Sequence, residues 1–110
     1  MITAAFTFDP ADKIIEVGVS GHADTAPYGY DIVCASVSSL VLATINGLEE
    51  YAQIDSKATV ENGMTKFQAV TSDSTQSTQA QAIMHTFYLA MVGLEDEYPD
   101  FIEVTVTEDN

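Results

Sequence analysis

Apolar and polar residues alternate near both ends of the chain. In residues 2–8 the even positions are apolar, and an alternation with the same period returns in residues 15–19 after the turn sequence DPAD. A period of two is typical of half-buried strands, so these two segments and the turn between them predict a β-hairpin. Residues 102–107 alternate in the same way. The pattern therefore predicts a hairpin in the first part of the chain and a final strand near residue 107.

Two internal segments carry apolar residues at helical spacing instead. The first follows Asp31, a good N-cap residue, and ends near Tyr51 or Ala52. The second ends before Pro99, because proline cannot continue a helix. Each segment has one broad apolar stripe, which predicts a helix packed on a core. The stripes consist of Val33, Val37, Leu40, Val41, Thr44, Leu48 and Tyr51 in the first segment and of Ile83, Phe87, Met91, Leu94 and Tyr98 in the second.

The chain between the two helices contains a hairpin signal and a polar stretch. Asn62-Gly63 separates two extended segments, which predicts a hairpin over residues 56–72. Residues 71–81 are rich in Ser, Thr and Gln, as in a linker, but the Ser-Asp-Ser run at 72–74 can equally cap the second helix. Both interpretations are compatible with a helix that begins after this stretch.

The predicted elements follow the order β-β-α-β-β-α-β in a single domain of residues 1–110. Each helix has one apolar stripe and each strand has one apolar face, so the economical arrangement is a mixed sheet with both helices packed against it. We therefore predict an α/β fold of the α+β kind. The length of 110 residues and the apolar content of 46% are enough for one core.

The charge of the chain is strongly unbalanced and narrows the choice of partners. Seventeen acidic residues face three lysines and no arginine, which gives a net charge of −14. Because this charge repels phosphate backbones, we expect no direct nucleic-acid binding, whereas a basic protein or peptide is attracted. We expect no signal peptide and no membrane span, because no stretch approaches about 18 apolar residues. A single cysteine suits a reducing cytosol, so the expected location is cytoplasmic.

One segment places the only cysteine near one of the two histidines. Cys34 falls in the predicted first turn of a helix, where unpaired N–H groups and the helix dipole favour a thiolate. His22 lies at a predicted strand end twelve residues earlier, within reach across a loop. In the functional interpretation, His22 takes the thiol proton, Cys34 attacks a carbonyl, and His22 then protonates the leaving amine. Oxyanion donors are expected in the backbone of Cys34 and Ala35.

These residues also have structural interpretations that the sequence leaves open. Lone cysteines are among the most often buried residues, so Cys34 can simply belong to the core. Asp31 can orient His22 as a third catalytic group, although the capping role is favoured. Ser38, one helical turn after Cys34, either donates a hydrogen bond at the site or faces solvent. His85 is expected to be structural, and no metal or cofactor is indicated.

A specific motif spans residues 21–38 and connects this segment to a known family. The chain has GHA at residues 21–23, YGYDIVCA at 28–35 and VS at 37–38. This sequence resembles the ribosomal-processing cysteine protease family, Prp, whose pattern is G-H-A, a short loop, G-x-D-I-V-C-A and a nearby V-S. The resemblance implies a cytoplasmic bacterial endopeptidase that removes the N-terminal extension of the large-subunit ribosomal protein numbered twenty-seven.

The same resemblance implies roles for individual residues and an oligomeric state. It assigns His22 and Cys34 as the catalytic pair and predicts a homodimer. It also implies a mobile loop between the pair, for which Gly21 and Gly29 are the expected hinges. Two other classes of function remain open from the sequence. One is an acidic assembly module that binds a basic ribosomal protein without cutting it, and the other is a thiol redox sensor, which the lack of a second cysteine disfavours.

Overall fold

The chain folds into one layer of helices and one layer of sheet. The computed structural model describes residues 1–22 and 30–109, and its elements follow the predicted order with one addition, a π-helical segment that continues the first helix. The elements are β1 (Ile2–Phe8), β2 (Ile14–Ser20), α1 (Tyr30–Asn46), η1 (Gly47–Tyr51), β3 (Thr59–Glu61), β4 (Met64–Gln68), α2 (Ser74–Glu97) and β5 (Ile102–Glu108).

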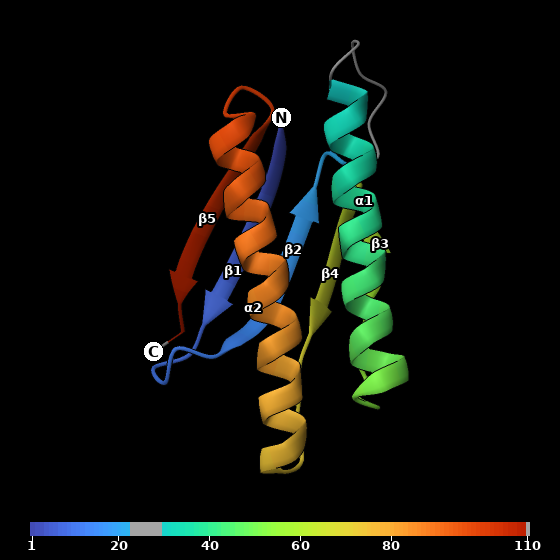
Figure 1. Ribbon diagram of the computed structural model, residues 1–110, viewed down its shortest axis with the longest axis vertical. Helices are drawn as coiled ribbons and strands as arrows, with labels where there is room; N and C mark the ends of the chain where they lie inside the picture. Colours follow the sequence, from blue (N-terminus) through green and yellow to red (C-terminus); the bar gives the residue numbers. More distant parts are fainter. Residues whose placement is uncertain (23–29, 110) are drawn as a thin grey trace.

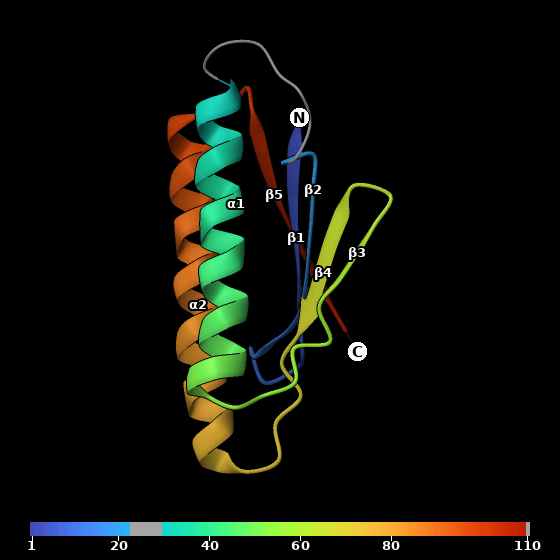
Figure 2. The same cartoon turned by 90° about the vertical axis from the view of Figure 1, so that its right-hand side faces the viewer.

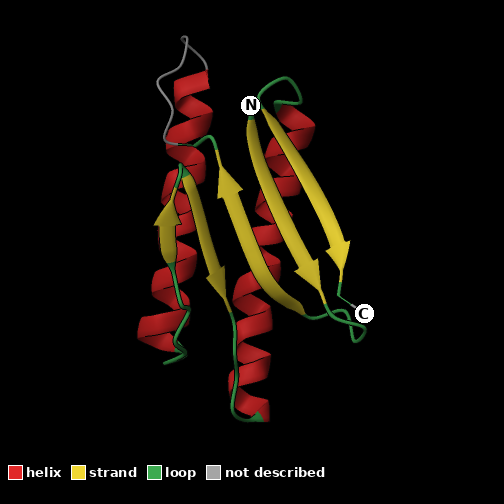
Figure 3. Ribbon diagram, turned by 180° about the vertical axis from the view of Figure 1, so that it is seen from behind, coloured by secondary structure: helices red, strands yellow, loops and turns green. Residues whose placement is uncertain are grey.

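The five strands form one mixed sheet in the order β3-β4-β2-β1-β5. β1 and β5 are parallel, whereas the other neighbouring strands are antiparallel. The helices α1 and α2 lie side by side along the sheet (Figure 1), and both cover the same face of it (Figure 2). Within residues 1–22 and 30–109, no helix lies on the opposite face of the sheet (Figure 3). This arrangement confirms the predicted mixed sheet with two helices packed against it.

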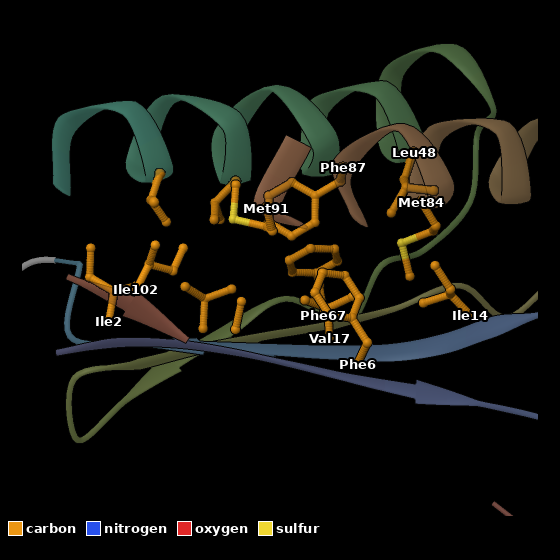
Figure 4. Packing of buried hydrophobic residues seen from close by; sticks show 14 of the residues in the cluster. Ile2, Phe6, Ile14, Val17, Leu48, Phe67, Met84, Phe87, Met91 and Ile102 are labelled. Atoms are coloured by element: carbon orange, nitrogen blue, oxygen red, sulfur yellow. The ribbon is translucent and has the colours of Figure 1, made fainter. Parts of the chain in front are cut away.

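Side chains from both layers meet in the core between the helices and the sheet (Figure 4). Phe6 and Phe67 project from the sheet toward Phe87 of α2, and each ring pair has a centroid distance of 5.8 Å. Burial of aromatic rings of this size supplies a large share of the stabilisation of a small domain. The largest fully buried side chains also include Ile2, Ile14, Leu48, Met84, Met91 and Ile102.

A β-bulge changes which residue of β2 enters the core. The sequence pattern predicted Ile15 on the apolar face, but the buried residue is Ile14. The pairing register shifts between Thr7, which pairs with Glu16, and Phe8, which pairs with Ile14. A bulge adds one residue to one strand and so reverses the alternation beyond it. Alternation within one strand gives no sign of such a shift, because it arises between strands.

The second helix begins with a side-chain cap rather than after a linker. Asp73 is the N-cap of α2, and its carboxylate accepts a hydrogen bond from the backbone N–H of Gln76 at 2.8 Å. This confirms the capping interpretation of the polar stretch. The buried stripe of α2 contains Phe87 and Met91 as predicted, and it extends toward the N-terminus of the helix through Ala80 and Met84.

The first helix is more apolar than we expected from the sequence. Tyr30–Tyr51 is long and apolar enough to cross a membrane by length and composition alone, with a mean hydropathy of 1.6 over 18 residues. The prediction that no stretch approaches a membrane span was therefore wrong. In the fold, Val33, Val37 and Leu48 are fully buried against the rest of the domain. Tyr51, assigned to this stripe from its spacing, is 75% exposed; it lies in η1, whose π-helical turn departs from the α-helical period that the spacing assumed.

Candidate active site

A tight turn at the end of β2 positions His22. Gly21 follows the strand with a φ of +86°, a conformation that favours glycine. A Cβ atom at this position would lie 2.5 Å from the carbonyl oxygen of Met1, so a side chain does not fit there. The turn places the His22 ring on the helix-covered side of the sheet, because its contacts come from α1 and from the inner face of β4.

Hydroxyl groups lie against both nitrogens of the His22 ring. Ser38 Oγ is 2.8 Å from Nδ1, and Thr65 Oγ1 is 3.2 Å from Nε2. A hydroxyl can donate to a bare nitrogen and accept from a protonated one. The ring therefore has a suitable partner at each nitrogen in both its neutral and its protonated form.

The thiol of Cys34 lies beside the residue that precedes His22. Cys34 is 6% exposed, and its Sγ donates to the carbonyl oxygen of Gly21 at 3.8 Å. The hydroxyl of Tyr30 donates to the same carbonyl at 3.4 Å. Ser38, one helical turn after Cys34, also contacts the His22 ring. The structure thus brings Gly21, His22, Cys34 and Ser38 into one cluster, and of the two positions left open for Ser38, at the site or facing solvent, it has the first.

The start of α1 differs from the prediction and changes the surroundings of Cys34. The helix begins at Tyr30, so Asp31 is its second residue and not its N-cap, and Asp31 is exposed. The buried Tyr30 ring, which packs edge-on against Phe101 at 5.5 Å, accounts for the earlier start. Cys34 is therefore the fifth helical residue. In α-helical geometry its N–H bonds to the carbonyl of Tyr30, so it is not the unpaired donor expected for an oxyanion hole.

Two predicted roles, the orienting role of Asp31 and the hinge role of Gly21 and Gly29, stay predictions. Both ring nitrogens of His22 are occupied by hydroxyls, while the orienting role weighed for the exposed Asp31 stays a prediction. Gly29 lies outside the described residues, together with the rest of the segment 23–29. The hinge role of Gly21 is also a prediction, although its close fit against Met1 shows how narrowly its position is defined.

Thr65 is the site residue that the sequence analysis missed. It lies on the inner face of β4 and is 8% exposed, although neighbouring buried positions of the sheet are apolar. A polar residue two positions before the apolar Phe67 was a signal, but its meaning depends on the pairing of Thr65 with Val19 near the end of β2. His85, expected to be structural, packs edge-on against Phe8 at a centroid distance of 5.9 Å.

Comparison with known proteins identifies the family. The family model described as cysteine protease Prp matches residues 1–103. The chain belongs to the Prp family of cysteine proteases. Family members named ribosomal processing cysteine protease Prp include one from Staphylococcus aureus strain Mu50, 29% identical over 104 residues, covering 94% of this chain and 97% of that protein. Another, from Bacillus subtilis strain 168, is 26% identical over 108 residues and covers 96% of each chain.

Solved structures agree with this family over nearly the whole chain. The protein SMU.848 from Streptococcus mutans matches with a TM-score of 0.89 and 27% identity, over 99% of this chain and 96% of that one. The Prp protease of S. aureus in complex with a substrate peptide matches with a TM-score of 0.86 and 27% identity, over 97% of this chain and 100% of that one. The chain is thus a cysteine protease with the fold of these Prp structures.

Proposed function

We propose that this Prp family member is a ribosomal-processing endopeptidase in which Cys34 is the nucleophile and His22 the general base and acid. The observation that carries the proposal is the cluster at the end of β2. There the Cys34 thiol contacts the Gly21 carbonyl, and Ser38, one turn further along α1, holds the ring of His22. A nucleophile, a base and a group that orients the base are the parts that covalent peptide hydrolysis requires.

The reaction follows from these roles in two stages. His22 takes the proton of the Cys34 thiol, and the sulfur attacks the carbonyl carbon of the scissile bond to form a tetrahedral intermediate. His22 then gives this proton to the amine nitrogen as the C–N bond breaks, which leaves a thioester on Cys34. In the second stage, His22 removes a proton from water, the hydroxide oxygen displaces the sulfur, and Cys34 regains its proton.

The proposed substrate is the N-terminal extension of the large-subunit ribosomal protein numbered twenty-seven. Two relatives are named ribosomal processing proteases, and the related S. aureus structure contains a substrate peptide. Ribosomal proteins are generally basic, and a net charge of −14 attracts a basic substrate while it repels ribosomal RNA. We further propose a cytoplasmic location, a homodimer, and a hinge role for Gly21.

Cleavage of the extended ribosomal protein tests this proposal directly. We expect the purified protein under reducing conditions to convert the extended form into one shorter product and to leave a form without the extension intact. Mass spectrometry of both fragments gives the cleaved bond. A stable complex with the uncut substrate after long incubation would instead support the non-catalytic assembly module and contradict the proposal.

Replacement of Ser38 tests whether it orients the base. Ser38→Ala removes the hydroxyl that lies 2.8 Å from Nδ1 of His22, so we expect kcat/KM to fall about tenfold, the value of one hydrogen bond of about 1.4 kcal/mol. Ser39→Ala is the matched control, because Ser39 is the next residue of α1 and is exposed. Equal activity of the two variants in steady-state peptide cleavage would exclude the role of Ser38.

A further inference from the structure

Thr65 contributes a buried hydroxyl to the same ring from the opposite layer of the fold. Its Oγ1 lies 3.2 Å from Nε2 of His22, whereas Ser38 approaches Nδ1 from α1. We infer that Thr65 is a positioning residue that holds the His22 imidazole in its working orientation. The consequence for activity rests on the proposed function of His22, whereas the effect on the ring does not.

The backbone on both sides of Thr65 fixes the position of this hydroxyl. β4 lies between β3 and β2, and Thr65 pairs with Val60 on one side and with Val19 on the other. Val19 lies in β2 three positions before His22, so the same pairing aligns the hydroxyl with the ring. A threonine side chain is β-branched and therefore has few χ1 rotamers. Thr65 is thus a rigid partner built on the sheet rather than on a loop.

The hydroxyl of Thr65 matches the proton transfers that His22 performs. A neutral imidazole has one N–H and one bare nitrogen, so one of its two hydroxyl partners accepts and the other donates. When His22 takes the thiol proton, the nitrogen that receives it faces the thiol, and both nitrogens then carry hydrogen. A hydroxyl beside the other nitrogen can rotate to accept from an N–H or to donate to a bare nitrogen, so it holds the ring in both states. A carboxylate could only accept, whereas the methyl groups of a valine could do neither.

Valine is the sharpest substitution, because it has nearly the shape of threonine and lacks the hydroxyl. We expect Thr65→Val to lower kcat about tenfold with little change in KM, because the ring loses a hydrogen bond and not a substrate contact. Thr65→Ser restores the hydroxyl, and we expect it to retain activity within about twofold. Thr44→Val is the matched control, because Thr44 is 7% exposed and its hydroxyl donates to the Leu40 carbonyl within α1.

Nuclear magnetic resonance of the ring nitrogens tests the same inference without substrate. The chain has two histidines, so a His85→Gln variant assigns the ring signals of His22 in ¹⁵N-labelled protein. We expect Thr65→Val to shift the Nε2 signal and change the balance of the two tautomers, whereas Thr65→Ser and Thr44→Val leave both close to wild type. Unchanged ring signals in Thr65→Val, or a wild-type kcat despite shifted signals, would overturn the inference.

Two further comparisons keep the outcome clear. If Thr65→Val does not fold by circular dichroism, Thr65→Ala supplies the same loss of the hydroxyl in a smaller side chain. If Cys34→Ala retains activity, the proposed catalytic function fails, but the ring signals still decide whether Thr65 orients His22. Failure of the function and failure of the inference therefore give different results.

Discussion

Cys34→Ala is expected to abolish peptide cleavage while it leaves the fold intact. Alanine removes the sulfur that forms the covalent intermediate. It fits the buried position in α1 because it is smaller than cysteine and favours a helix. The loss of a nucleophile lowers kcat by about 10⁴-fold or more, since nothing else in the site can form the thioester. The measurement is product formation from the extended substrate, followed by mass spectrometry over hours under reducing conditions.

The result for Cys34→Ala is interpreted together with a variant of His22 and a control variant. His22→Ala is expected to lower kcat by about 10²–10⁴-fold, because the thiol proton loses its acceptor. Both variants should keep the wild-type circular dichroism spectrum and bind the uncut substrate. Ser36→Ala serves as the control, because the Ser36 hydroxyl donates to the Ile32 carbonyl within α1 and does not contact the ring. Full activity in either Cys34→Ala or His22→Ala would refute the proposed catalytic pair.

Gly21→Ala is expected to have the second largest effect, because one substitution violates two constraints at once. The φ of +86° costs an alanine about 1–2 kcal/mol, and the new Cβ would lie 2.5 Å from the Met1 carbonyl oxygen. Relief of that contact requires movement of backbone, which typically costs about 1–3 kcal/mol more. We expect the free energy of unfolding to fall by about 3 kcal/mol and activity to be lost even where the protein folds, since the Gly21 carbonyl contacts the Cys34 thiol.

Gly63→Ala is the matched control for this prediction. Gly63 also has a positive φ, +74°, but nothing lies within 4 Å of its added Cβ. We expect it to lose only the backbone contribution of about 1–2 kcal/mol and to keep full activity. Urea unfolding and peptide cleavage measured on both variants separate the two effects. If the variants have equal stability, the contact with Met1 does not constrain the turn.

The sequence was sufficient for all the elements except η1, because the first hairpin, the last strand and both helices have a strong period and Asn62-Gly63 marks the second hairpin. The alternation in β1 and β5 and the stripes of α1 and α2 depend only on which face of an element is buried. Prediction from the sequence failed where contacts between two elements determine which residue is buried or where a helix begins. The bulge that buries Ile14 in place of Ile15 arises from the pairing of β1 with β2. The early start of α1 arises from the packing of Tyr30 on Phe101.

The distinction between patterns within one element and contacts between elements applies to the active site as well. His22 and Cys34 lie within one short motif that resembles the Prp family, and Ser38 follows Cys34 by one helical turn, so all three were candidates from the sequence while their structural interpretations stayed open. Thr65 lies 43 positions after His22 and reaches it only because β4 pairs with β2. A residue that joins a site through strand pairing leaves only a weak local signal, which here is a polar residue on the apolar face of a strand. The corrected start of α1 likewise removes the backbone of Cys34 as an expected oxyanion donor.

The parallel pairing of β1 with β5 has a consequence for the order of events during synthesis. β1 lies between β2, which leads to His22, and β5, which is the last strand along the chain. Contacts between such distant segments form late, and before they form β1 is an open sheet edge. While residues 102–108 are still inside the ribosome, the strand next to the active-site strand is unpaired on one side. The sheet that contains the active-site strand is therefore completed only after residues 102–108 have emerged and β5 has paired with β1.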